Sequence, residues 1–150
     1  NIIVVYGGKF CYINADDPYR KIDTIIQEQI EPGVRISRIK ATHCMDMLAS
    51  EDEREQISQG RDVYWLTPGW MKYHHYVFQG WDKGLANENF PKHIGGAIML
   101  DAIGYYDKIV QNDPEKLLEF SDWMGIPMEP YPVTLDRLLG LLSDEVKSED

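Results

Sequence analysis

The most constraining feature of the sequence is an alternation of short apolar runs with longer amphipathic segments. Residues 2–6 form a continuous apolar run that Gly7-Gly8 closes, as in a strand buried on both faces. After a helix start that we place at residues 16–18, isoleucine recurs at helical spacing over residues 22–30. Strands that alternate with helical segments of this length pair in parallel through right-handed crossovers. Further strands are expected at residues 34–40, 62–67 and 97–101.

This alternation predicts a single α/β domain over residues 1–150. We expect a three-layer sandwich whose open, mostly parallel sheet has four to five strands. The fifth strand, at residues 128–133, belongs at an edge because its prolines cannot donate to a ladder. The chain starts at Asn1, directly before an apolar run, so we also expect it to be the C-terminal part of a longer chain.

The composition excludes several classes of protein. Apolar residues make up 43% and charged residues 27% of the 150 residues, as in a globular domain rather than a disordered one. The 15 Lys and Arg against 25 Asp and Glu give a net charge of −10, which argues against nucleic acid or an anionic membrane as partner. No apolar run approaches the roughly 18 residues of a membrane span, and no signal-peptide pattern is present. We therefore expect a cytoplasmic location.

Chemically capable residues follow the expected strands. In open parallel sheets, ligands bind beyond the carboxyl ends of the strands, so these residues are candidates for a shared site. The sequence sets no oligomeric state and does not decide whether the site is catalytic. The candidates are Gly7, Gly8, Cys11, His43, Cys44, Thr67, Gly69, Trp70 and Asp101.

Two cysteines and a histidine form the first candidate group. The pair does not make the disulfide framework of a small secreted protein. Cys11 and Cys44 each follow a strand, and His43 precedes Cys44 near an expected helix start, where a thiolate is favoured. Two sulfurs and an imidazole suit zinc, iron or cobalt. Alternatively, both cysteines are small buried hydrophobes and His43 is a capping residue.

The second group follows later strands. Gly69, in the turn after Thr67, lets the backbone approach a ligand closely, and the Trp70 indole offers a flat apolar surface. Together with Gly7 and Gly8, these residues are candidates for cofactor binding. A tight turn with a core tryptophan is the alternative. Asp101 ends an apolar strand and can be a general base, a metal ligand or the cap of the next helix.

The order of these landmarks resembles an uncharacterised family of archaeal and bacterial anaerobes, the domain of unknown function 1638. The resemblance covers the chain from Ile2 to about Leu142. The sequence departs from the family pattern at Tyr12, where His is frequent, and at His43, where Asp is usual. The segments that carry the resemblance are Val5-Tyr6-Gly7-Gly8-Lys9 with Cys11, His43-Cys44-Met45-Asp46-Met47-Leu48, Tyr64-Trp65-Leu66-Thr67-Pro68-Gly69-Trp70 and Leu100-Asp101.

The resemblance implies a longer N-terminus with another strand and a further cysteine, and an association with corrinoid-dependent methyl transfer. We therefore predict a protein that binds a metal or metallocofactor through Cys11, His43 and Cys44, with a methyltransferase or corrinoid protein as partner. One alternative is a metal-free thiol enzyme with Cys44 as nucleophile and His43 or His74 as base. Another is a non-catalytic protein whose acidic surface and aromatic segment 73–81 bind a partner.

Overall fold

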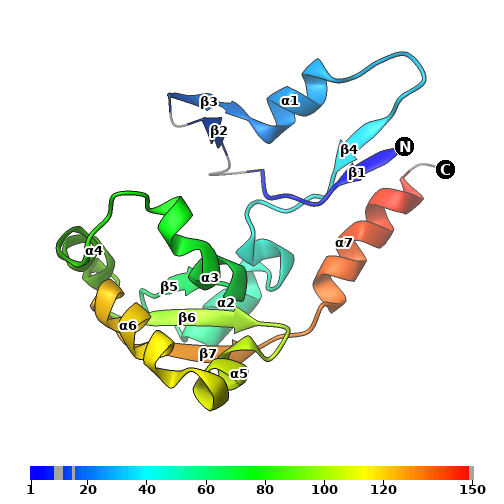
Figure 1. Cartoon of the computed structure of the whole chain (residues 1–150). Helices are drawn as coiled ribbons and strands as arrows, with labels where there is room; N and C mark the ends of the chain where they lie inside the picture. Colours follow the sequence, from blue (N-terminus) through cyan, green and yellow to red (C-terminus); the bar gives the residue numbers. More distant parts are fainter. Residues whose placement is uncertain (9–11, 15, 149–150) are drawn as a thin grey trace. The chain divides into compact units, whose positions relative to one another are not determined.

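The computed structural model describes residues 1–8, 12–14 and 16–148 (Figure 1). The chain divides into two compact units, each with its own sheet structure. Unit 1 comprises Asn1–Ser50 and Leu135–Asp150, and unit 2 comprises Glu51–Thr134. Two compact units can be parts of one domain, so the single-domain expectation stays a prediction.

Unit 1 contains a parallel pair of strands and an antiparallel hairpin. Ile2 of β1 lies opposite Ile36 of β4, and Val4 lies opposite Arg38. The chain between these strands forms the hairpin and then a short helix. The elements are β1 (Ile2–Val4), β2 (Tyr12–Asn14), β3 (Asp17–Lys21), α1 (Ile22–Glu28), β4 (Ile36–Arg38), the 3-10 helix η1 (Met45–Met47) and α7 (Asp136–Lys147).

The helix start expected at residues 16–18 is wrong. Residues Asp17–Lys21 form strand β3, and α1 begins only at Ile22, without a side-chain cap. The proline that suggested a first helical turn is equally compatible with extended backbone, because its fixed φ fits both. The helix itself ends near the expected position, since its C-cap is Gln29.

Unit 2 contains a parallel three-stranded sheet in the order β5-β6-β7. Central β6 is buried along its whole length, whereas β7 is a largely exposed edge strand that contains two prolines, as expected. Its elements are α2 (Glu51–Ser58), β5 (Tyr64–Leu66), α3 (Pro68–Val77), α4 (Lys83–Asn89), the 3-10 helix η2 (Phe90–Lys92), β6 (Ala97–Asp101), α5 (Tyr105–Asn112), α6 (Pro114–Met124) and β7 (Met128–Pro132).

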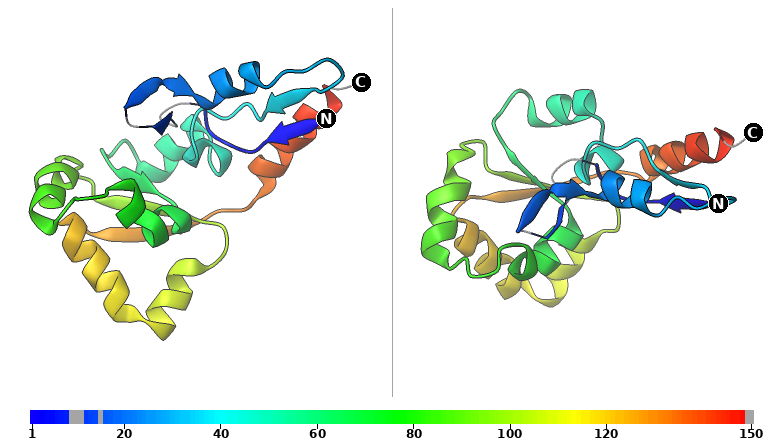
Figure 2. Two further views of the ribbon diagram at one scale, coloured as in Figure 1. Left: turned by 45° about the horizontal axis from the view of Figure 1, so that its top comes forward. Right: turned by 90° about the horizontal axis from the view of Figure 1, so that it is seen from above.

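Helices cover both faces of the sheet in unit 2. Met99 and Leu66 pack with Phe120 and Met124 in one apolar cluster, on the face that α3, α5 and α6 cover. Figure 2 shows α2 on the opposite side of the same sheet. Unit 2 therefore has the helix, sheet and helix layers of an α/β sandwich.

The predicted fold class is confirmed, but the sheet is smaller than expected. Parallel strands alternate with helices, yet they form sheets of two and three strands instead of one sheet of four to five. Periodicity indicates which residues are extended and says nothing about which ladders their backbone groups complete. In the described part of the chain, no helix is both long enough and apolar enough to cross a membrane.

Candidate functional site

The carboxyl end of β1 lies against the loop that follows β4. Gly7 is buried, and a Cβ added there would lie 2.6 Å from His43 Cα and 3.0 Å from Cys44 N. The Gly8 N–H donates to the carbonyl of Ala41 at 3.1 Å. Parallel pairing of β1 with β4 therefore brings the expected Gly7-Gly8 turn and the His43-Cys44 pair together.

Cys11 lies outside the described residues. It follows Gly8 by three positions in the sequence. That the two sulfurs lie side by side stays a prediction.

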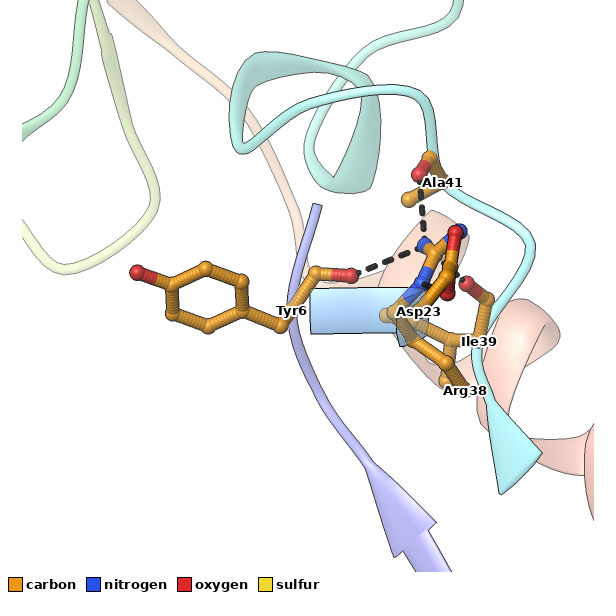
Figure 3. Close-up of polar contacts among 5 residues, drawn as sticks. All are labelled: Tyr6, Asp23, Arg38, Ile39 and Ala41. Atoms are coloured by element: carbon orange, nitrogen blue, oxygen red, sulfur yellow. Dashed lines mark hydrogen bonds and ion pairs between the residues drawn. The ribbon is translucent and has the colours of Figure 1, made fainter. Parts of the chain in front are cut away.

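Arg38, at the end of β4, connects the elements around this edge (Figure 3). Its Nε and Nη2 atoms donate to the two carboxylate oxygens of Asp23 on α1, at 2.7 and 3.1 Å. Its Nη1 donates to three backbone carbonyls at 2.9 to 3.1 Å, those of Tyr6, Ile39 and Ala41. One guanidinium thus holds the chain after β1, the chain after β4 and helix α1 in place.

The hydrogen bonds from Arg38 hold the pKa of the Asp23 carboxyl below its ordinary value of 3.8, against the opposing effect of partial burial. Gly8 packs against the same guanidinium, since a Cβ there would lie 2.4 Å from Arg38 Nη2. The shallow hollow above these residues has a volume of about 380 Å³ and is also lined by Lys40 and Thr42.

Cys44 and His43 differ in how far their positions are fixed. The Cys44 thiol is free and exposed at the start of η1. His43 Nδ1 accepts a hydrogen bond from the Asp46 N–H at 3.3 Å. A neutral imidazole with this bond carries its proton on Nε2, so the ring presents a donor rather than a metal-binding lone pair at that nitrogen.

Asp46, two residues after Cys44, is buried and fully engaged. One carboxylate oxygen accepts from Arg137 Nη2 at 2.7 Å, and the other accepts from the Thr42 N–H at 2.8 Å. Arg137 Nε also donates to the Asp46 carbonyl. This pair attaches α7 to the segment that carries Cys44, and no sequence pattern pointed to it.

Thr67, Gly69 and Trp70 lie in unit 2, after β5. Thr67 Oγ1 accepts from the Trp70 N–H at 3.3 Å and so caps α3. The Trp70 indole packs edge-on against Tyr64 and Phe78, with ring centroids 5.4 and 5.2 Å apart. This is the arrangement of a capped turn followed by a core tryptophan, and the cofactor-binding role of these residues stays a prediction.

Asp101 ends β6 and holds the turn before α5. Its carboxylate oxygens accept from the Ile103 N–H at 3.0 Å and the Tyr106 N–H at 2.8 Å. Burial opposes the charge, but the backbone N–H groups of residues 103–106 outweigh it and keep the pKa of Asp101 below 3.8. A carboxylate held in this way is a weak base, so its geometry fits the capping alternative better than general-base catalysis.

The comparisons with known proteins concern nearly the whole chain. A family model described as "Protein of unknown function (DUF1638)" matches residues 1–142. The chain belongs to this family. No curated protein and no solved structure matches the chain. In this DUF1638 protein the match spans the first segment of unit 1, all of unit 2 and the first half of α7.

The described part of this DUF1638 protein contains no group of three or more His, Cys, Asp or Glu side chains that can hold a metal ion. Cys11 lies outside that part. His43 and Cys44 are adjacent, and the nearby Asp46 carboxylate is already taken by Arg137 and Thr42. A metal site at this edge therefore depends on Cys11.

Proposed function

We propose that this protein binds a thiophilic metal ion, or a metallocofactor such as a corrinoid, through the thiolates of Cys44 and Cys11. The observation that carries the proposal is the contact of Gly7 with the backbone of His43 and Cys44. It attaches the chain that leads to Cys11 to the residue beside Cys44. Zinc, iron and cobalt all accept such ligands.

The proposal gives each of the residues around Cys44 in unit 1 a different role. The two thiolates would hold the metal, which would supply a Lewis acid. His43, whose Nδ1 accepts from the Asp46 N–H, acts beside Cys44 as a proton carrier; it becomes the third ligand only if its ring gives up that hydrogen bond. Arg38 and Arg137 position the segments on either side of Cys44.

Metal analysis of the whole chain, purified without chelator and under anaerobic conditions, tests the proposal. We expect about one equivalent of metal, and after cobalt loading a thiolate-to-cobalt charge-transfer absorption. Cys44→Ser and Cys11→Ser should each abolish that absorption. His93→Ala is the matched control, because His93 lies in unit 2 and pairs with Asp62 at 3.0 Å. Stoichiometric metal retained in both cysteine variants contradicts the proposal.

A metal-free thiol enzyme is the second candidate, and the exposure of the Cys44 thiol favours it. His43 is the adjacent base once its Nδ1 gives up the hydrogen bond from the Asp46 N–H. The other suggested base, His74, belongs to unit 2 and directs Nδ1 at the carbonyl of Met71. In a Cys11→Ser background, alkylation of Cys44 should then slow when His43 is replaced by Ala. The same replacement at exposed His75 should have no effect. Equal rates in all three proteins exclude His43 as the activating base.

A partner-binding role rests on the exposed part of the aromatic segment. Tyr76 and Val77 are 74% and 61% exposed, whereas Phe78 and Trp81 pack against the core of unit 2. A methyltransferase subunit or corrinoid protein is the proposed partner. Tyr76→Ser with Val77→Ser should abolish co-purification with such a subunit, while a variant without cysteines should keep it.

A further inference from the structure

A second hollow lies entirely within unit 2, where α3, α6 and the start of α5 meet. Its volume is about 580 Å³, within the range that holds a small organic molecule. Part of the aromatic segment 73–81, His74 among it, lines this hollow together with residues of α5 and α6. The residues that matter for its chemistry are Lys72, His74, His75, Lys116, Glu119 and Trp123.

The hollow is locally cationic on a chain whose net charge is −10. Lys72 and Lys116 both line it, and Glu119 is its one acidic residue among the described lining residues. Across residues 1–8, 12–14 and 16–148, neither lysine forms an ion pair; Lys72 Nζ lies 5.2 Å from the ring centroid of Tyr73. Two lysines without carboxylate partners match the charge of a dianion.

One side of the hollow is a fixed aromatic surface. The His74 ring packs against Trp123 and Phe120, with centroids 4.7 and 4.9 Å apart. His74 Nδ1 lies 2.7 Å from the Met71 carbonyl, and donation to that oxygen keeps the ring in place with its lone pair on Nε2. Burial raises the pKa of Tyr105, with Lys72 opposing, so its hydroxyl remains a neutral donor on the α5 side. These contacts therefore fix the aromatic side of the hollow in the absence of a ligand.

We infer that this hollow binds an aromatic phosphate monoester, whose ring stacks on the aromatic side while its phosphate is held by Lys72 and Lys116. Lysine recognises phosphate as a point charge, and two lysines suit its second negative charge. Flat rings gain from stacking beyond the area that they bury. The inference concerns residues 71–123 only and does not depend on the thiolate site of unit 1.

Titration of the whole chain with phenyl phosphate, followed by backbone amide chemical shifts, tests the inference. We expect saturable shifts in α3, α6 and the start of α5. Phenol and inorganic phosphate each supply half of the proposed ligand and should bind more weakly by about tenfold or more, which is about 1.4 kcal/mol. Equal binding of inorganic phosphate, or shifts confined to other elements, would overturn the inference.

Variants separate the hollow from general charge effects. Lys72→Gln with Lys116→Gln should weaken phenyl phosphate binding by about tenfold, equivalent to about 1.4 kcal/mol. Lys108→Gln, on α5 and outside the hollow, removes the same kind of charge and should leave binding unchanged. Glu119→Gln removes the opposing carboxylate and should strengthen binding, so the outcome is not explained by damage to the fold. Unchanged affinity in both the double lysine variant and Glu119→Gln would overturn the inference.

Discussion

The two units are stabilised by different kinds of contact. In unit 2 the strand residues Leu66 and Met99 are fully buried in an apolar and aromatic cluster. In unit 1 the paired strands are only half-buried, and arginine–carboxylate contacts connect the elements: Arg38 with Asp23, and Arg137 with Asp46. A two-stranded sheet buries little apolar surface, so polar contacts carry a larger share of its specificity. The proposed thiolate site lies in the unit with the smaller core.

The largest effect is expected from the core of unit 2. Phe120→Ala should lower the free energy of unfolding by about 4 kcal/mol, because it leaves a cavity between α3 and α6. Leu118→Ala, on the same helix but 68% exposed, should cost under about 0.5 kcal/mol. Urea denaturation measures both, and Phe120→Leu, with a loss of about 1 kcal/mol, serves if the alanine variant does not fold. Similar losses for Phe120→Ala and Leu118→Ala would contradict the assigned core.

Next in size is the partly buried ion pair of unit 1. Arg137→Met keeps the apolar stem of the side chain but leaves the Asp46 carboxylate without its charged donor, so we expect a loss of about 2 kcal/mol. Arg61→Met removes an exposed pair with Glu129 at 2.8 Å and should cost about 0.5 kcal/mol or less. Equal losses for the two variants in urea denaturation would show that polar contacts do not have a larger role in unit 1 than in unit 2.

A glycine pair tests the close contact at the proposed site. Gly7→Ala forces the backbone of His43 and Cys44 to move and should cost about 2 kcal/mol. Gly140→Ala, in α7 with open space around it, should instead stabilise the protein by about 0.5 kcal/mol. Thermal unfolding measures the change in stability of each variant, which should be a loss for Gly7→Ala and a gain for Gly140→Ala. A neutral Gly7→Ala variant would remove the observation on which the thiolate site rests.

The smallest effect concerns Asp101 and depends on pH. A carboxyl whose pKa is lowered on folding stabilises the protein above its ordinary value of 3.8, and that contribution disappears as the pH falls through the lowered value. Asp101→Asn should therefore cost about 1 kcal/mol at neutral pH and progressively less in acid. Asp107→Asn, exposed in the first turn of α5, is the control. A stability difference for Asp101→Asn that does not shrink in acid denaturation would show that the charge of Asp101 is not what holds the turn.

Local signals in the sequence predicted much of the fold. Asp113 caps α6, and Gly125 ends the same helix with a positive φ, as their residue types indicate. The run at 97–101 forms the central strand, and every residue in it is buried. Helix α4 was missed, although Asp82 caps it, since seven residues give too short a period to recognise.

The candidate site was predictable only in part. Parallel strand ends meet at one edge, so the approach of Gly7 to His43 and Cys44 follows from topology. The roles of Arg38 and Arg137 did not follow, because an arginine at a strand end or in a helix looks like any exposed charge until its distant partner is known. The role of Asp46 could not be predicted for the same reason, because its partner Arg137 lies 91 residues away in the sequence.

That separation has a consequence for synthesis. During translation, residues 1–50 emerge from the ribosome before the contiguous stretch that makes unit 2. Arg137 and the rest of α7 emerge after unit 2. The nascent chain can bury the apolar cluster of unit 2 before Arg137 has been synthesised and can pair with the Asp46 carboxylate. We therefore expect the segment around Cys44 to take its final shape last, when translation has passed α7.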